Sequence, residues 1–200
     1  MRDITHQNTP SLWRQAWKLL ETAANTGGEA FSTPCISTVA TLETSRPRVV
    51  VLRECNAADA TLTFYTDARS IKVNHLRNGS TVSWCFWDPE AQLQLIGGGK
   101  TNEQASPKRR KIWDGLPKHS RKAYATRHPP GTALAERGTD LPPDWESRDL
   151  AQTEYAFDHF AVLTTCLEWA EVLHLDRGGN TRIAATCSPE GGWTFTYLVP

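Results

Sequence analysis

The stretch RPRVVVLREC, residues 46–55, places the aliphatic run 49–52 between Arg48 and Arg53. Such a run is typical of a buried strand, and we expect this strand to span residues 48–53. A strand cannot bury a guanidinium cheaply, because a buried charge needs a partner. Each arginine is therefore expected either to emerge at the rim of the sheet or to hold an anion.

The chain is long enough for one large domain, and its charges balance. It has 200 residues, with 22 Lys and Arg against 22 Asp and Glu. This length, without an internal repeat or a low-complexity tract, predicts a single domain over residues 1–200. The balanced charge predicts neither nucleic acid nor an anionic membrane as a partner. Any anion site must therefore be local.

The sequence is typical of a soluble, cytoplasmic protein. The first residues, MRDITHQNTPSLWR, contain no apolar stretch resembling a signal peptide, and no run reaches the length of a membrane span. The five cysteines are an odd number and form no C-x-x-C pair. Their apolar or strand-like surroundings predict buried free thiols in a reducing compartment, rather than disulfides or a metal site.

Periodicity and turn residues divide the chain into helices and strands. Apolar residues at three- and four-residue spacing predict an N-terminal helix over residues 10–26, ended by Gly27 and Gly28. A short helix is expected within residues 67–80 and a helical stretch over residues 106–124. Strands are expected over residues 30–42, 48–53, 61–65, 81–87, 91–97, 160–167, 169–175, 182–187 and 193–199.

The order of these elements favours an antiparallel sheet. Most of the strands are joined by hairpins rather than by crossover helices. We therefore expect a mainly β (α+β) fold, a closed antiparallel barrel with flanking helices. A polar segment over residues 128–148 is rich in Pro and Gly and longer than an ordinary connection. Such a loop is usually functional or mobile.

Several enzyme classes lack their signatures in this sequence. It contains no G-x-S-x-G elbow, no H-E-x-x-H, no Walker loop and no G-x-G-x-x-G after a strand. Its six histidines show no ligand-like spacing with carboxylates, so we expect no metal site.

Thr66, Ser70 and Lys72 are spaced so that two hydroxyls, a helix N-terminus and an ammonium meet at one place. A phosphate monoester would be well held there by backbone N–H groups and the cation. The alternative is that Ser70 merely caps the helix and Lys72 faces solvent. Arg48 on the neighbouring strand could supply a second cation to the same anion, which favours the phosphate site.

Three segments in this order resemble the flavin-binding motifs of the pyridoxamine 5′-phosphate oxidase-like proteins, whose fold is the FMN-binding split barrel. They are RPRVVVLR (46–53), TFYTDARSIK (63–72) and AQLQLIG (91–97). The C-terminal sequence EWAEVLHLDRGGNTRIAAT (168–186) is similar to the end of these proteins, where a Trp and an Arg complete the flavin site. The resemblance is strong over about residues 30–100.

The resemblance implies a binding role for each matching residue. Arg48 and Lys72 would bind the FMN phosphate together with Thr66 and Ser70, and Tyr65 belongs to the same motif. The backbone of Val49, Val50 and Val51 would lie beside the isoalloxazine ring, and Gln92 would hydrogen-bond its polar edge. Arg182 and Trp169 would match the C-terminal flavin residues. Arg53 stands where the family's oxidases carry Lys, and it keeps the charge with a different geometry.

The resemblance also implies a homodimer with the flavin at the interface, and oxidation of a small amine or alcohol such as pyridoxamine 5′-phosphate with dioxygen as acceptor. The family's substrate-binding segment is absent, however, and residues 113–136 stand in its place. Arg121, Arg127 and His128 of this region would form either an anion site or a solvated basic surface. No residue stands out as a general base. The alternatives are a flavin reductase-type enzyme using NAD(P)H or another donor, a flavin-binding protein without turnover, and a barrel that holds a different phosphorylated ligand.

Overall fold

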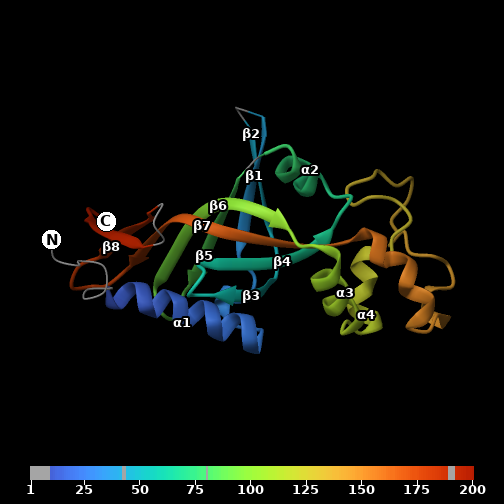
Figure 1. The fold of residues 1–200 in the computed structure, drawn as a ribbon, viewed down its shortest axis with the longest axis horizontal. Helices are drawn as coiled ribbons and strands as arrows, with labels where there is room; N and C mark the ends of the chain where they lie inside the picture. The colour runs from blue at the N-terminus through green and yellow to red at the C-terminus, as the bar shows by residue number, and fades with distance from the viewer. Residues whose placement is uncertain (1–9, 42–43, 80, 189–191) are drawn as a thin grey trace. The chain divides into compact units, whose positions relative to one another are not determined.

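The structure is a computed structural model that describes residues 10–41, 44–79, 81–188 and 192–200. Figure 1 shows its helices and strands. The α-helices are α1 (Ser11–Thr26), α2 (Ile71–Arg77), α3 (Ser106–Asp114) and α4 (Lys118–Arg121). The strands are β1 (Cys35–Thr41), β2 (Thr44–Val49), β3 (Leu52–Asn56), β4 (Thr61–Asp67), β5 (Val82–Asp88), β6 (Leu93–Glu103), β7 (Phe160–His174), β8 (Thr181–Cys187) and β9 (Trp193–Leu198).

The chain contains two compact units, which are described separately. Unit 1 holds the described residues of Met1–Phe64, Ser80–Thr101 and Thr164–Pro200, and unit 2 holds Tyr65–Gly79 and Asn102–Leu163. The boundary falls within β4, β6 and β7, so each of these strands contributes residues to both units. The expectation of one domain over the whole chain stays a prediction.

The strands form a mainly antiparallel β architecture, as expected. Neighbouring strands follow the order β2-β1-β5-β6-β7-β4-β3, and β8 pairs with β7 and β9. Among the described residues these pairings do not close the sheet, so the expectation of a closed barrel was wrong. One reason lies in β2, where Pro47 lacks a backbone donor and therefore suits an edge strand.

The run 49–52 does not form the single buried strand expected over residues 48–53. β2 ends at Val49 and pairs with β1, whereas β3 begins at Leu52 and pairs with β4. Val49 is 66% exposed and Val51 is 40% exposed, and Leu52 alone of this run is fully buried at 2%. The run therefore links the two ends of the strand order instead of filling the core.

Other segments differ less from expectation. The strand expected from residue 30 begins only at Cys35, because Ala30–Ser32 form a 3₁₀ turn, and its expected end at residue 42 lies outside the described residues. The two strands expected over residues 160–167 and 169–175 are one continuous strand, β7. The helical stretch 106–124 is α3, α4 and the 3₁₀ turn Lys122–Tyr124.

The N-terminal helix is confirmed and covers unit 1 on one side. Its apolar stripe is buried, and the helix packs against β3 (Figure 1). The ring of Trp13 lies 5.0 Å from that of Trp193 and 5.5 Å from that of Phe195, measured between centroids. These two aromatic contacts fix the helix to β9 at the C-terminal end of the chain.

Unit 2 has an aromatic core of its own. Trp113, Tyr124 and Phe160 pack together, with ring centroids 4.9–6.1 Å apart. Trp145 and Leu141 from the polar segment 128–148 join this cluster. The segment is therefore anchored to the core of unit 2, although its only helical turn among the described residues is Trp145–Ser147.

No helix in the described part of the chain combines the length and apolarity needed to span a membrane.

The glycines in the middle of β6 allow β7 to approach closely. A Cβ on Gly99 would lie 2.0 Å from the carbonyl oxygen of Cys166, and one on Gly98 would lie 3.0 Å from the indole nitrogen of Trp169. Backbone at such a distance cannot yield without moving the strand. The run Gly97–Gly98–Gly99 therefore sets the β6–β7 contact.

Gly99→Ala should lower the free energy of unfolding by about 1–3 kcal/mol, because the added methyl group forces β6 and β7 apart. Urea denaturation measures this change. The matched control is Gly115→Ala, where a Cβ meets nothing nearer than 3.5 Å and φ is −81°. The control should stay within about 0.5 kcal/mol of the original protein. Equal effects of both substitutions would refute the close-approach explanation.

Candidate functional site

The polar cluster expected at the start of the short helix is present in unit 2. The ammonium of Lys72 donates to Thr66 Oγ1 at 2.8 Å and to Ser70 Oγ at 3.2 Å. Ser70 occupies the N-cap position, but its side chain makes no cap hydrogen bond. The alternative in which Ser70 only caps and Lys72 only faces solvent is therefore wrong. Each hydroxyl accepts from the ammonium and keeps its own hydrogen to donate.

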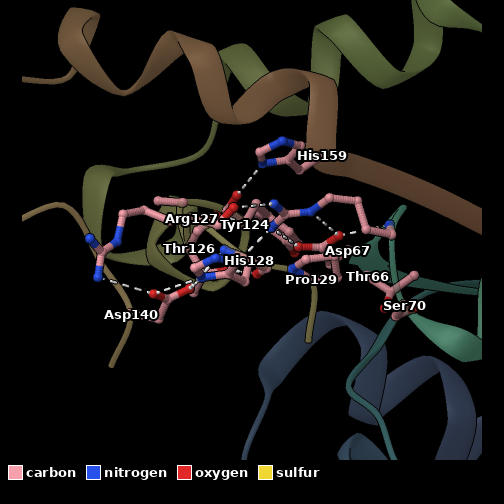
Figure 2. Close-up of polar contacts among 12 residues, drawn as sticks. Thr66, Asp67, Ser70, Tyr124, Thr126, Arg127, His128, Pro129, Asp140 and His159 are labelled. Atoms are coloured by element: carbon pink, nitrogen blue, oxygen red, sulfur yellow. Dashed lines mark hydrogen bonds and ion pairs between the residues drawn. The ribbon is translucent and has the colours of Figure 1, made fainter. Parts of the chain in front are cut away.

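The turn between β4 and α2 is fixed by an ion pair next to this cluster. The Asp67 carboxylate, which is almost fully buried, accepts from the backbone N–H of Arg69 at 2.8 Å and from its guanidinium at 2.7 and 3.1 Å. Arg69 also donates to the carbonyl and hydroxyl oxygens of Thr126, each at 3.1 Å (Figure 2). Because Arg69 pairs with Asp67, the negative charge of this carboxylate is offset and its repulsion of an anion bound nearby is weakened.

The helix adds little to this site. α2 has seven residues, so its dipole is small, and the positive charge comes from the Lys72 ammonium. Thr66 and Ser70 are nearly buried and Lys72 is half-buried. A half-buried ammonium with two hydroxyls suits an oxyanion, because partial burial strengthens the attraction and the hydroxyls supply directed donors.

Arg48 lies in unit 1, on β2, opposite Ile36 of β1. Its guanidinium donates to the hydroxyl of buried Thr38 at 2.6 Å. Burial lowers the pKa of Arg48, the nearby Cys35 thiol partly offsets this, and Arg46 lowers it further. The side chain therefore turns toward the sheet instead of emerging freely at its rim. Its convergence with Lys72, which lies in unit 2, stays a prediction.

Gln92 lies in the turn before β6 and not on the strand itself. Its φ of 48° is left-handed, its amide nitrogen donates to Pro89 O at 2.7 Å, and its carbonyl accepts from Leu175 N at 2.9 Å. These contacts join the β5–β6 turn to the end of β7. Gln92 also lines an open depression of unit 1, together with Leu175, Asp176, Arg177 and Asn180.

Arg182 and Trp169 both have partners within unit 1. The guanidinium of Arg182 on β8 binds Glu171 on β7, with its Nε 2.9 Å from the carboxylate. Trp169 is partly exposed and lies across Gly98. The structure thus gives each residue a role in pairing neighbouring strands. Their roles in flavin binding stay predictions.

The remaining residues of the expected site are distributed over both units. Tyr65 lies in unit 2, where its ring packs on Phe160 at 5.4 Å. In unit 1, the backbone N–H of Val50 donates to Pro34 O at 3.0 Å, between exposed Val49 and Val51. Arg53 is exposed on β3. Their flavin contacts stay predictions as well.

Arg121 is neither a surface cation nor part of an anion site. It is 3% exposed, and its guanidinium donates to the carbonyl oxygens of Leu116, Leu150 and Trp113 at 3.0–3.3 Å. It also lies over the Trp113 ring at 4.4 Å. Both interpretations of Arg121 made from the sequence were therefore wrong. Its five donors tie separate chain segments into the core of unit 2.

Asp140 is a site residue that the sequence analysis missed. Its carboxylate, 10% exposed, accepts from the backbone N–H of His128 at 2.7 Å, from His128 Nδ1 at 3.1 Å and from the Arg127 guanidinium at 3.2 Å (Figure 2). The His128 N–H, then its ring and charge and the Arg127 charge, lower the pKa of Asp140 against the opposing effect of desolvation. The Asp140 carboxylate thus binds both Arg127 and His128. These two residues therefore do not form a purely solvated basic surface.

A metal centre is not indicated in the described ranges, which place no three His, Cys, Asp or Glu side chains together as ligands.

Residues 11–102 match the model of a protein family described as pyridoxamine 5′-phosphate oxidase, FMN-binding domain. A comparison with curated protein sequences finds no match. The predicted resemblance is confirmed over residues 11–102, which match the model of this family's FMN-binding domain.

Two solved structures are similar over nearly the whole length of the chain. One is a pyridoxamine 5′-phosphate oxidase-related, FMN-binding protein from Nostoc punctiforme PCC 73102, with 19% identity, a TM-score of 0.73 and coverage of 97% of this chain and 100% of that one. The other is PhzG from Burkholderia lata 383 in complex with tetrahydrophenazine-1-carboxylic acid, with 15% identity, a TM-score of 0.72 and coverage of 99% and 100%. At these identities the likeness shows the fold alone. It confirms the split-barrel fold class.

Acidic pH should destabilise the loop 127–140, which the contacts of Asp140 with Arg127 and His128 stabilise. Because its pKa is depressed, the carboxylate stabilises the folded loop above the ordinary carboxyl range, and this contribution is lost as the pH falls through the lowered pKa. We expect the hydrogen-exchange protection factor of the His128 amide to drop in that acidic range. Asp140→Asn should lower the protection at neutral pH and remove the acid-dependent step.

The matched control for this experiment is Asp144→Asn, because Asp144 pairs with Arg148 instead of His128. It should leave the acid-dependent step at His128 in place. A step that persists unchanged in Asp140→Asn would contradict the assignment.

Proposed function

We propose that the chain binds FMN noncovalently and works as an FMN-dependent oxidoreductase on a small substrate. The observation that carries the proposal is the Lys72 cluster, which lies within the segment matched by the FMN-binding family model. Its ammonium and two hydroxyls are the donor set that a terminal phosphate requires. The flavin would supply the redox chemistry, and the chain would bind it, orient it and set its electrostatic surroundings.

The residues present fit this cofactor at its phosphate end. Lys72 already donates hydrogen bonds to both Thr66 and Ser70, and Arg69 compensates the adjacent Asp67. Arg48 would add a second cation. In the structure its guanidinium donates to the Thr38 hydroxyl. At the ring end, Gln92 offers an amide beside an open depression, which supports a hydrogen bond to a polar ring edge. Arg182 is less suited, since Glu171 already satisfies its charge.

The proposed reaction is oxidation of a small amine or alcohol with electrons passed to dioxygen. Pyridoxamine 5′-phosphate is the first candidate substrate, because the matched family model carries that name. The segment 126–140 would bind the substrate, because Asp140 holds the basic residues Arg127 and His128 in place there. A reductase using another electron donor, or a flavin binder without turnover, would share the same phosphate site.

We also propose that the chain works as a homodimer with the flavin at the interface. In the single chain, Val49 and Val51 expose 66% and 40% of their surface on a segment that the flavin motif includes. Burying such valines against a second copy is favourable, by about 25 cal/mol per Å² of apolar surface. Sedimentation at rising protein concentration should give twice the mass of the chain, and a monomer at every concentration would refute the dimer.

Removing the cations should weaken FMN binding. Lys72→Ala and Arg48→Ala should each raise the Kd for FMN by about 10- to 150-fold, because each loses about 1.5–3 kcal/mol of a charged hydrogen bond. Fluorescence titration of FMN measures these changes. The control is Lys122→Ala, which removes an exposed lysine of unit 2 that pairs with Glu146. It should leave the Kd unchanged.

The double variant tests whether both cations bind one phosphate. If they do, the loss in the Arg48→Ala, Lys72→Ala protein should differ from the sum of the single losses by more than about 0.5 kcal/mol. Two losses that simply add would contradict a shared phosphate, even if each single variant binds FMN weakly.

The electron acceptor can be tested directly on the FMN-loaded protein. With pyridoxamine 5′-phosphate under air, we expect hydrogen peroxide release in step with substrate loss. Flavin bleaching by NADH or NADPH without bleaching by pyridoxamine 5′-phosphate would instead support the reductase. Retention of FMN with no bleaching by either donor would support a binder without turnover.

A further inference from the structure

The cysteines of the described residues are free, but they are not all buried as expected. Cys85 and Cys166 are exposed, and Cys35, Cys55 and Cys187 are half-buried. Cys85 is exposed because β5 alternates strictly, with Val82, Trp84 and Phe86 pointing inward. The residues between them, including Cys85, therefore point outward.

Cys35 and Cys85 are direct partners across an antiparallel strand pair. In the β1–β5 register Cys35 faces Cys85 at one end of the paired segment, next to the pair Ile36–Trp84. Directly opposed residues project from the same face of a sheet. Their Cα atoms lie about 4.5 or 5.5 Å apart, depending on the type of pair. Both values fall within the range of about 4.4–6.8 Å over which a disulfide can form.

Within the described part of the chain, no strong hydrogen bond holds either sulfur away from the other. Cys35 Sγ makes a weak contact with its neighbour's carbonyl, Ile36 O, at 3.8 Å. Both strands are fixed by further pairing, β1 with β2 and β5 with β6. The two thiols are therefore kept opposite each other by the sheet, and their encounter requires only side-chain rotation.

The protonation of these thiols sets how fast they react. Burial, and then the neighbouring Cys35, raise the pKa of Cys85, so its reactive thiolate becomes more abundant as the pH rises. Burial, and then Glu21, raise the pKa of Cys55 to about 11. Cys55 therefore stays protonated near neutral pH, which disfavours its reaction as a thiolate.

We propose that Cys35 and Cys85 form a reversible intrachain disulfide when the protein meets a peroxide. One thiolate attacks hydrogen peroxide, which gives a sulfenic acid and, with one proton, water. The second thiol then attacks the sulfenic sulfur, and the hydroxyl leaves as a second water after taking the thiol proton. The two thiols together lose two electrons and two protons, and the peroxide is reduced to two waters.

One member of the Cys35–Cys85 pair lies on a strand that also contributes to the Arg48 contact of unit 1. The bond would tie β1 to β5, and β1 also carries Thr38, whose hydroxyl holds Arg48. Cross-strand disulfides of this kind are strained and so are readily reduced by thiols, which suits a switch more than a permanent brace. The proposal does not depend on the flavin, because the peroxide can come from any source.

The test uses the full chain treated with hydrogen peroxide, followed by alkylation of the remaining thiols and mass analysis of unreduced proteolytic peptides. We expect one linked peptide pair that contains residues 35 and 85, monomeric on a denaturing gel, formed faster at higher pH and lost on adding dithiothreitol. Cys35→Ser and Cys85→Ser should each abolish the linked pair. Cys166→Ser, which removes the other exposed thiol, should leave its yield unchanged.

Three results would overturn the proposal. They are a linked pair that joins other cysteines, a bond between two chains, and over-oxidation of Cys85 while Cys35 stays reduced. Circular dichroism of both serine variants shows that they are folded, and either variant alone suffices if the other fails to fold.

Discussion

The half-buried ammonium of Lys72 is the feature on which the functional account depends. The hydroxyls of Thr66 and Ser70 accept from it and fix its direction, while the adjacent Asp67 carboxylate is paired with Arg69. If Asp67 paired with Lys72 instead, the local charge would be zero and an incoming phosphate would face a carboxylate. The turn from β4 to α2 thus places the Asp67–Arg69 ion pair beside an ammonium that donates hydrogen bonds to two hydroxyls.

This part of the site could be predicted from the sequence because it is local. Thr66, Ser70 and Lys72 lie within seven positions, so a strand end followed by a helix start determines where they meet. Asp140 could not be found in this way, because its partners His128 and Arg127 are twelve and thirteen positions away across an irregular loop. Only the folded loop reveals that one carboxylate binds both.

The run 49–52 shows a different limit of sequence reasoning. Its apolar residues predict strand structure, which is correct only at the two ends of the run. The apolar pattern alone does not distinguish a strand buried in the core from an exposed segment that connects two edge strands. Arg121 shows the reverse error, since a basic residue in a polar sequence lies buried among backbone carbonyls of unit 2. In both cases tertiary contacts from distant segments decide the environment. The family match over residues 11–102 includes the proposed phosphate site, whereas the proposed substrate segment 126–140 lies outside it.

The central claim is that the chain recognises the phosphate of FMN through its cations. Comparing the Kd values for FMN and for riboflavin, which lacks the phosphate, tests this claim most directly. The account predicts that FMN binds at least about tenfold more tightly, since each charged hydrogen bond to the phosphate contributes about 1.5–3 kcal/mol. It also predicts that high salt narrows the difference. Equal affinities for FMN and riboflavin would contradict the account, whatever the colour of the purified protein.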